Sequence, residues 1–99
     1  MNAILNGIFV GAEPEIEIEK GDELYRVQNC TFQEHDEYGD PMTGRYVVVE
    51  IWNEKIEEYL NPLRIGDKVE AQVEVITRRK HNKAERYRNR ITLVSLTKN

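Results

Sequence analysis

The sequence contains little cysteine, few aromatic residues and no long apolar run. Its 99 residues include one cysteine, and aromatic side chains make up 8% of the chain. A single cysteine, Cys30, excludes an internal disulfide framework and suits a reducing compartment, so we expect a cytoplasmic protein. No apolar run approaches the roughly 20 residues that span a bilayer, and residues 1–7 lack the pattern of a secretory signal. We therefore expect no membrane partner.

Residue patterns that carry catalysis or bind cofactors are also scarce. Cys30 and His35 lack the second pair of ligands that zinc requires. Ser95 has no evident triad partners, and no glycine-rich phosphate loop of the GxxxxGK[ST] type occurs. We predict that the protein is not an enzyme and that it uses no cofactor and no metal site.

Charge is present in quantity but is unevenly distributed. The net charge of −4 argues, on its face, against a polyanionic partner. Residues 1–60, however, carry 14 acids and 4 bases, whereas residues 61–99 carry 4 acids and 10 bases. Most of the bases lie in one stretch, opposed only by Glu85: Arg78, Arg79, Lys80, Lys83, Arg86, Arg88 and Arg90. Such a cluster is an electrostatic footprint that the whole-chain charge hides.

Hydrophobic alternation predicts a chain made mostly of strands. Five strands are expected. The first covers residues 3–10 and, after an interruption at Glu13-Pro14, residues 15–19, and the others cover residues 24–32, 46–52, 68–77 and 91–96. Gly7 predicts a bulge or bend in the first strand. Pro14 and the alternating glutamates of residues 15–19 indicate an edge strand or a protruding hairpin. Residues 33–44 are polar and are expected to form a loop.

The strand over residues 46–52 has two distinct faces. Val47, Val49 and Ile51 fall on one face, which we predict to be buried because the other face carries Glu50. Tyr46 and Trp52 are then left on the more open face.

A short helix is expected to follow over residues 53–60. Asn53 is a suitable N-cap for this helix. Ile56, Tyr59 and Leu60 form one apolar stripe at helical spacing.

These elements predict an all-β protein with a single domain over residues 1–99. Frequent turns and short connections favour a closed antiparallel barrel. A five-stranded Greek-key barrel with one short helix between strands 3 and 4 is the OB-fold.

The chain also resembles a known family. The resemblance is carried by four segments: Tyr46–Trp52, the following helix Asn53–Leu60, the segment Leu63–Ala71 and the final stretch Tyr87–Leu96. In these segments the chain resembles bacterial single-stranded-DNA-binding proteins and the related primosomal replication protein N. The resemblance implies that single-stranded DNA lies across the barrel face and that the protein forms homo-oligomers, as dimers or tetramers. It also implies a role in replication, recombination or mobile-element transfer, with proteins of those processes as partners.

The chain departs from that family in ways that affect the expected binding. No acidic tail follows Leu96, and the first two strands are rich in acids. We therefore expect local binding of a short stretch rather than wrapping of a long one.

The basic stretch and the aromatic residues predict non-enzymatic binding of single-stranded nucleic acid, DNA rather than RNA, with little sequence preference. Cations would contact phosphates and aromatic rings would stack on bases. The candidate residues are Trp52, Arg78, Arg79, Lys80, Lys83, Arg86, Tyr87, Arg88 and Arg90.

Other interpretations of these residues are open at the level of sequence. The basic stretch is also compatible with a solvated hairpin or with a helix over residues 83–91. Trp52 and Tyr46 are also compatible with a core or a subunit interface. An alternative function is a protein-interaction module that uses the acidic strands around Glu13–Glu23.

Overall fold

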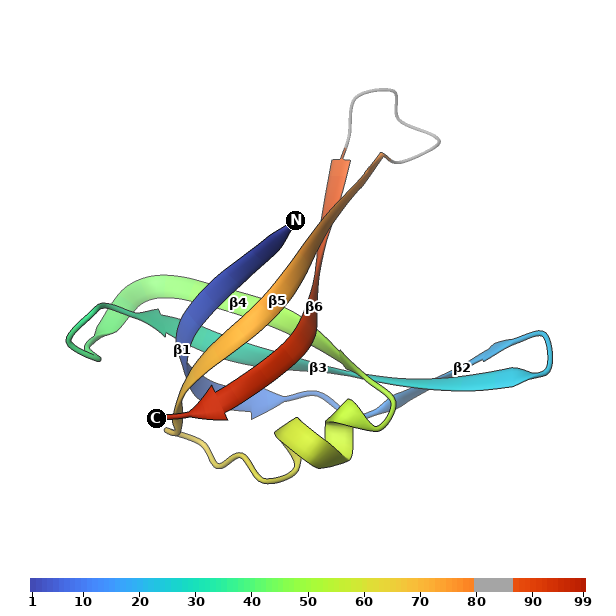
Figure 1. The fold of residues 1–99 in the computed structure, drawn as a ribbon, viewed down its shortest axis with the longest axis horizontal. Helices are drawn as coiled ribbons and strands as arrows, with labels where there is room; N and C mark the ends of the chain where they lie inside the picture. The colour runs from blue at the N-terminus through green and yellow to red at the C-terminus, as the bar shows by residue number, and fades with distance from the viewer. Residues whose placement is uncertain (80–86) are drawn as a thin grey trace.

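The computed structural model describes residues 1–79 and 87–99, and these form one continuous sheet with one short helix. The elements in chain order are β1 (Asn2–Ala12), β2 (Ile16–Lys20), β3 (Glu23–His35), β4 (Pro41–Trp52), η1 (Ile56–Leu60), β5 (Lys68–Arg79) and β6 (Tyr87–Lys98). In Figure 1, the hairpin of β2 with the start of β3 extends away from the body, as do the paired ends of β5 and β6 and the turn end of β3 and β4.

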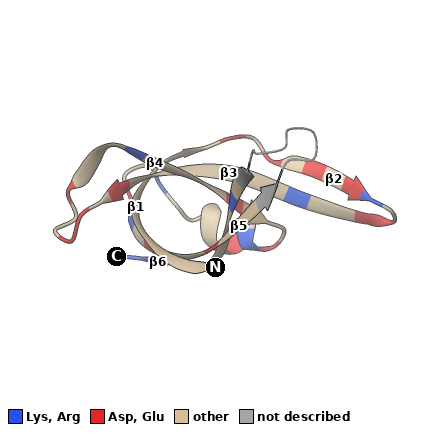
Figure 2. Ribbon diagram, turned by 90° about the horizontal axis from the view of Figure 1, so that it is seen from above, with Lys and Arg blue, Asp and Glu red and all other residues tan. Residues whose placement is uncertain are grey.

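Five of the strands close into a barrel. The sheet order is β1-β5-β6-β4-β3-β2, and an additional pairing of β1 with β3 completes the ring. The ring is visible in Figure 2, with β2 outside it. β4 and β6 pair in parallel at Glu50 and Thr92, and the other pairings are antiparallel. With η1 between the third and fourth barrel strands, the predicted OB-fold is confirmed.

β1 closes the barrel because it pairs along both of its edges. Residues 2–8 pair with β5, and residues 7–12 pair with β3. The register shift lies between Phe9 and Gly11, which leaves Val10 as the bulged residue. Of the predicted bulge or bend at Gly7, the bulge is wrong in position, because it lies at Val10. Gly7 lies where the two pairings overlap, and a Cβ there would lie 2.9 Å from the Cβ of Phe32.

The barrel interior is filled by alternate residues from every barrel strand. Phe9 and Phe32 meet with ring centroids 5.8 Å apart. Val49 and Ile51 are fully buried and Val47 is partly buried, whereas Tyr46 is 57% exposed, so the predicted faces of this strand are confirmed. Cys30 is also buried in the core, and this burial raises the pKa of its thiol to about 12. It packs as a small apolar group.

The helix is shorter than predicted and has a different start. η1 is a single wide turn in which the Asn61 N–H donates to the Ile56 carbonyl at 2.9 Å. Ile56 and Leu60 are buried against the barrel, as the apolar stripe predicts. The prediction that Asn53 caps the helix is wrong, because Lys55 occupies that position and no side chain caps the helix.

The predicted polar loop over residues 33–44 is mostly strand. β3 continues to His35 and β4 begins at Pro41, so only residues 36–40 form the turn. One carboxylate oxygen of Asp36 accepts hydrogen bonds from the N–H groups of Tyr38 and Asp40, each at 2.9 Å. The paired strands extend beyond the core here and carry polar residues, which hid the strand from the hydrophobic pattern.

The predicted hairpin between β5 and β6 is confirmed where the structure describes it. Arg78 pairs with Arg88, and Arg79 pairs with Tyr87. The alternative of a helix is wrong over residues 87–91, which belong to β6. Lys80, Lys83 and Arg86 lie outside the described residues.

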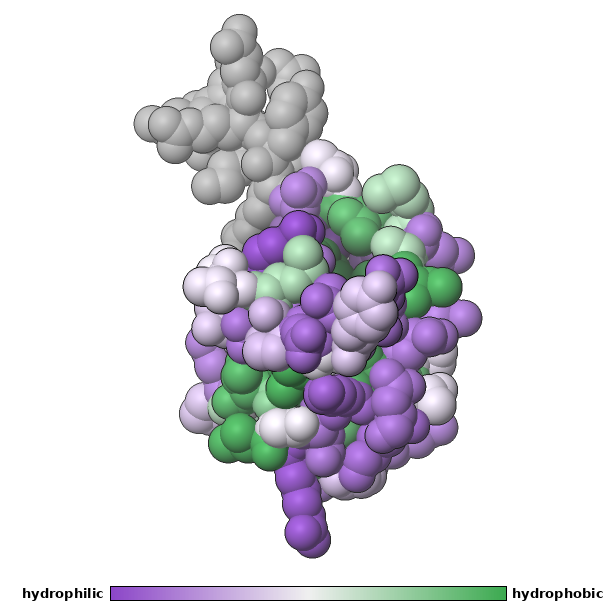
Figure 3. Space-filling model, turned by 90° about the vertical axis from the view of Figure 1, so that its left-hand side faces the viewer, coloured by the Kyte–Doolittle hydropathy of each residue, from purple (hydrophilic) through white to green (hydrophobic). Residues whose placement is uncertain are grey.

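The surface mixes polar and apolar side chains. On the face shown in Figure 3, hydrophilic side chains separate several smaller hydrophobic areas. Among the described residues, no helix is long and apolar enough to cross a membrane.

We predict that Gly7→Ala destabilises the fold because the new methyl group must displace the Phe32 side chain. Overpacking of this kind costs about 1–3 kcal/mol. Urea unfolding followed by circular dichroism measures the difference. Asn6→Ala, at the exposed neighbouring position, is the matched control. Equal stability of the two variants would contradict the role assigned to Gly7.

Candidate functional site

The outward face of β3 and β4 forms a continuous stripe. In antiparallel pairing, residues that lie opposite each other share a face. Trp52 pairs with Val27, and Ile18 of β2 pairs with Tyr25, two residues before Val27 on β3. The face that carries Trp52 therefore continues onto the projecting hairpin of β2 and β3. At its other end the same face carries Tyr46.

A groove crosses this stripe beside Trp52. It has a volume of about 440 Å³ and is lined by Ile18, Lys20, Tyr25, Trp52, Asn53 and Arg90. A second hollow of about 230 Å³ is lined by Asn29, Val48, Glu50, Asn89, Arg90 and Ile91. Because Arg90 lines both, the two hollows are neighbours, and together we call them the outer groove. It combines aromatic, cationic and amide side chains from four strands and the turn after β4.

At the middle of the outer groove, Glu50 connects an aromatic side chain, Trp52, with a cationic side chain, Arg90. Its carboxylate accepts hydrogen bonds from Arg90 Nη2 at 2.7 Å and Arg90 Nε at 3.1 Å. The indole Nε1 of Trp52 also donates to Glu50, at 3.1 Å. The Arg90 guanidinium lies 5.9 Å from the Trp52 ring centroid, within cation–π range. The hydrogen bonds to Glu50 raise the pKa of Arg90 above its ordinary value.

The structure brings together part of the predicted site. Trp52 is half-buried and Arg90 is partly exposed, and both lie in the outer groove. Trp52 is therefore not a core residue, and neither is the exposed Tyr46. The structure describes the backbone of Arg78, Arg79, Tyr87 and Arg88, which lie in the same hairpin as Arg90 but farther from the barrel. For Lys80, Lys83 and Arg86 the assignment rests on the sequence.

The sequence did not identify the residues that β2 and β3 contribute to the outer groove. Ile18, Lys20 and Tyr25 line the outer groove, although they belong to a segment that is rich in glutamate. Alternation along β2 places Glu17 and Glu19 on the opposite face from Ile18 and Lys20. The acids that Figure 2 shows along β2 therefore include two that face away from the groove. The long-range pairing of Trp52 with Val27, together with the register between β2 and β3, reveals this arrangement.

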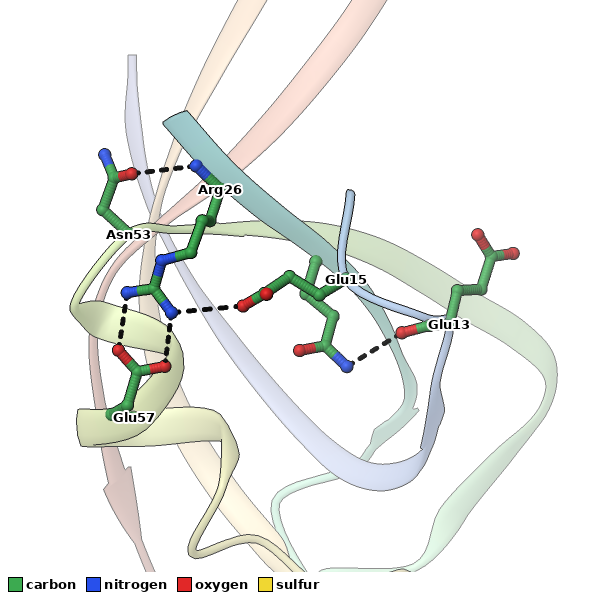
Figure 4. A network of polar contacts seen from close by, with 6 residues as sticks. Glu13, Glu15, Arg26, Asn53 and Glu57 are labelled. Atoms are coloured by element: carbon green, nitrogen blue, oxygen red, sulfur yellow. Dashed lines mark hydrogen bonds and ion pairs between the residues drawn. The ribbon is translucent and has the colours of Figure 1, made fainter. Parts of the chain in front are cut away.

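Arg26 fixes the base of the projecting hairpin, as Figure 4 shows. Its guanidinium donates to both carboxylate oxygens of Glu57, at 2.9 and 2.6 Å, and to Glu15 at 3.2 Å. The hydrogen bond to Glu57 is the main reason that the pKa of Arg26 is raised. The same bond lowers the pKa of Glu57 below its ordinary value of 4.5.

Asn53 extends the β3–β4 ladder by one further pair. Its N–H donates to the Arg26 carbonyl at 2.9 Å, and its side-chain Oδ1 accepts from the Arg26 N–H at 3.0 Å. The side-chain oxygen thus replaces a backbone carbonyl. The backbone of Asn53 has a φ of 53°, a left-handed conformation that asparagine tolerates better than most residues. The chain can therefore turn sharply toward η1 immediately after Trp52.

A metal centre has no support among residues 1–79 and 87–99. No group of three or more His, Cys, Asp or Glu side chains in these residues is arranged to hold a metal ion. The outer groove offers an aromatic face, hydrogen-bonding groups and charged side chains.

Comparison with known proteins finds likeness at the level of structure. No protein-family model matches the sequence, and no curated protein matches it. Among solved structures, the chain is similar to a small single-stranded DNA-binding protein from Streptomyces coelicolor. The alignment covers 100% of this chain and 92% of that chain, with 12% identity and a TM-score of 0.44. At this level the likeness assigns neither a family nor a function to the chain.

We predict that the Arg26–Glu57 pair stabilises the fold in a pH-dependent way. Because the pKa of Glu57 is lowered in the folded state, its contribution is present above pH 4.5 and is lost as the pH falls through the folded pKa. Glu57→Gln should therefore lower the thermal unfolding midpoint at pH 7, and the difference from wild type should shrink at pH 3.

The control for this experiment is Glu54→Gln, an exposed carboxylate in the turn before η1. It should change the unfolding midpoint less than Glu57→Gln at pH 7. A Glu57→Gln difference that is the same at both pH values would show that the ion pair is not its cause.

Proposed function

We propose that the protein binds single-stranded nucleic acid, DNA in particular, through the outer groove and the adjoining basic hairpin. The observation that carries the proposal is the position of Trp52. This partly exposed ring lies between Tyr25 and Lys20 on one side and Arg90 on the other, where β6 leaves the barrel toward the basic hairpin. The proposed activity is binding without a chemical reaction.

The residue types of this surface match the two chemical parts of a single strand. Exposed bases offer flat faces, on which aromatic rings stack with little regard to sequence. The phosphate backbone attracts lysine and arginine, whose binding releases counterions. We assign base stacking to Trp52 and Tyr87 and add Tyr25, which lines the groove. We assign phosphate contacts to the six cations Arg78, Arg79, Lys80, Lys83, Arg86 and Arg88.

The dimensions of the stripe favour local binding. Tyr46 and Trp52 lie six positions apart on β4, which corresponds to about 20 Å at the usual strand rise of about 3.3 Å per residue. That length accommodates a few nucleotides, comparable with the smaller site sizes known for OB-folds. Residues 1–60 carry 14 acids against 4 bases, so most of the remaining surface repels a polyanion.

A protein-interaction role for the projecting hairpin is the second candidate. On the face away from the outer groove, Leu24 is 54% exposed and pairs with Glu19, next to Glu17. An apolar side chain beside carboxylates suits a partner with basic and apolar residues. Three further properties stay predictions: assembly into homo-oligomers (dimers or tetramers), partners in replication or mobile-element transfer, and a cytoplasmic location.

We predict salt-dependent binding of a fluorescently labelled oligo-dT. Fluorescence anisotropy should show affinity that falls linearly with the logarithm of salt concentration. The slope of the logarithm of the binding constant against the logarithm of salt concentration measures the number of phosphate contacts. Changing Arg78, Arg79 and Lys80 together to alanine should make this salt slope shallower by about 2, at about 0.7 per lost phosphate contact.

A control variant tests whether the position of the charges matters. Arg45, Arg64 and Lys98 are exposed and lie outside the basic hairpin, so changing all three to alanine removes the same charge elsewhere. This variant should keep a salt slope closer to that of wild type. No binding of oligo-dT by wild type at low salt would overturn the proposed function, and equal slopes in the two triple variants would overturn the assignment of the hairpin.

We predict that Trp52→Ala weakens binding of oligo-dT. Loss of one base–aromatic stack costs about 1–3 kcal/mol, which corresponds to roughly 5- to 150-fold in affinity. Tyr38→Ala removes an aromatic ring that is 81% exposed in the β3–β4 turn and should bind as wild type does. Anisotropy of the labelled oligonucleotide reports both variants. Unchanged affinity of Trp52→Ala would rule out stacking on this ring.

A further inference from the structure

We propose that Glu50 is a positioning residue that makes the middle of the outer groove a surface for bases and excludes phosphates from it. The proposal rests on the proposed function and specifies which part of the strand lies there. It also changes the role of Arg90, which the sequence predicts to be a phosphate contact.

The first argument is that Arg90 already uses two of its hydrogen-bond donors to bind Glu50. Two of its nitrogens, Nη2 and Nε, donate to the two carboxylate oxygens of Glu50, at 2.7 and 3.1 Å. A side-on bidentate pair of this kind is among the stronger hydrogen-bonded arrangements in proteins. A phosphate that binds Arg90 would have to displace this carboxylate or approach it closely. Arg90 therefore contributes little net charge to the attraction of a polyanion.

The second argument is the geometry that the pair imposes on Trp52. The carboxylate of Glu50 also accepts from Trp52 Nε1 at 3.1 Å, which restricts rotation of the indole. The Arg90 guanidinium is held 5.9 Å from the ring centroid. Guanidinium and aromatic planes both stack on bases. The three side chains thus present a pre-oriented, nearly uncharged platform at the point where the two hollows of the outer groove meet.

The third argument is where the other bases lie in the sequence. Beyond Arg90, the described strands of the hairpin carry Arg78, Arg79 and Arg88. Lys80, Lys83 and Arg86 lie between them in the sequence, and only Glu85 opposes the six bases there. A strand whose phosphates follow that hairpin would direct its bases toward Trp52 and Arg90. The carboxylate of Glu50 reinforces this orientation because it repels phosphates from the platform.

The test compares the salt dependence of oligo-dT binding in wild type, Glu50→Gln and the double variant Glu50→Gln/Arg90→Gln. Glu50→Gln keeps an acceptor for Trp52 Nε1 but releases the charge of Arg90. We expect several-fold tighter binding at low salt and a slope steeper by about 0.7, the value for one added phosphate contact. The double variant replaces an ion pair with two neutral amides and should return to the wild-type slope.

Glu70→Gln is the charge-matched control, because Glu70 is exposed on β5 and pairs with β1 and the end of β6. This variant should keep the wild-type slope. If the double variant is flatter than wild type by about 0.7, Arg90 contacts a phosphate in the wild type and the inference is wrong. An unchanged slope in Glu50→Gln would overturn it as well.

The outcomes separate this inference from the proposed function. If wild type fails to bind oligo-dT at low salt, the proposed function fails and the inference fails with it. If wild type binds and only the comparison of slopes fails, the role of Glu50 alone is rejected. Circular dichroism of each variant checks folding. If Glu50→Gln alone were unfolded, the double variant would still decide the question through its slope relative to wild type.

Discussion

The architecture depends on the pairing of β1 with two different strands. Its first half pairs with β5 and its second half with β3, and Gly7 lies where the two pairings overlap. Without that double pairing the strands would form an open sheet with two edges. Closure gives β3 and β4 an inner face, where Phe32 and Val49 are buried, and an outer face that carries Trp52. The core and the outer groove are thus opposite sides of the same two strands.

The distribution of charge in the folded chain follows from strand alternation. The glutamates of β2 alternate with apolar and cationic residues, so pairing with β3 turns Glu17 and Glu19 away from Trp52. At the same time it brings Lys20 and Tyr25 toward Trp52. A segment that is acidic in sequence therefore contributes one cation and one aromatic ring to the groove. Net charge, even when summed over half of the chain, could not reveal this because it ignores side-chain direction.

Much of the fold could be predicted from the sequence because its signals are local. The alternation in residues 46–52 identified the buried and the open face of β4, and the strand order indicated the barrel. Local signals failed where polar residues form strand, as in residues 33–44. They also failed at Asn53, whose side chain completes the ladder with Arg26 and does not cap a helix.

The candidate site was less predictable because it depends on contacts between distant segments. The sequence suggested Trp52 as an open aromatic residue and Arg90 as one of several cations. Their connection through Glu50 depends on the hydrogen bond from Arg90 to Glu50, two residues that lie 40 positions apart in the chain. The contribution of Tyr25 depends on the register between β2, β3 and β4. No spacing rule within one segment contains that information.

The alternating charges of β2 have a consequence for how molecules of this protein meet in solution. Among the described strands, β2 pairs only with β3, so its other edge presents unpaired backbone N–H and C=O groups. Such an edge is a template for strand addition by a neighbouring chain. Glu17, Glu19 and Lys20 place charges along that edge, and burying them in an intermolecular sheet would require their desolvation. The glutamate-rich strand thus protects the projecting hairpin against aggregation and leaves its groove face accessible.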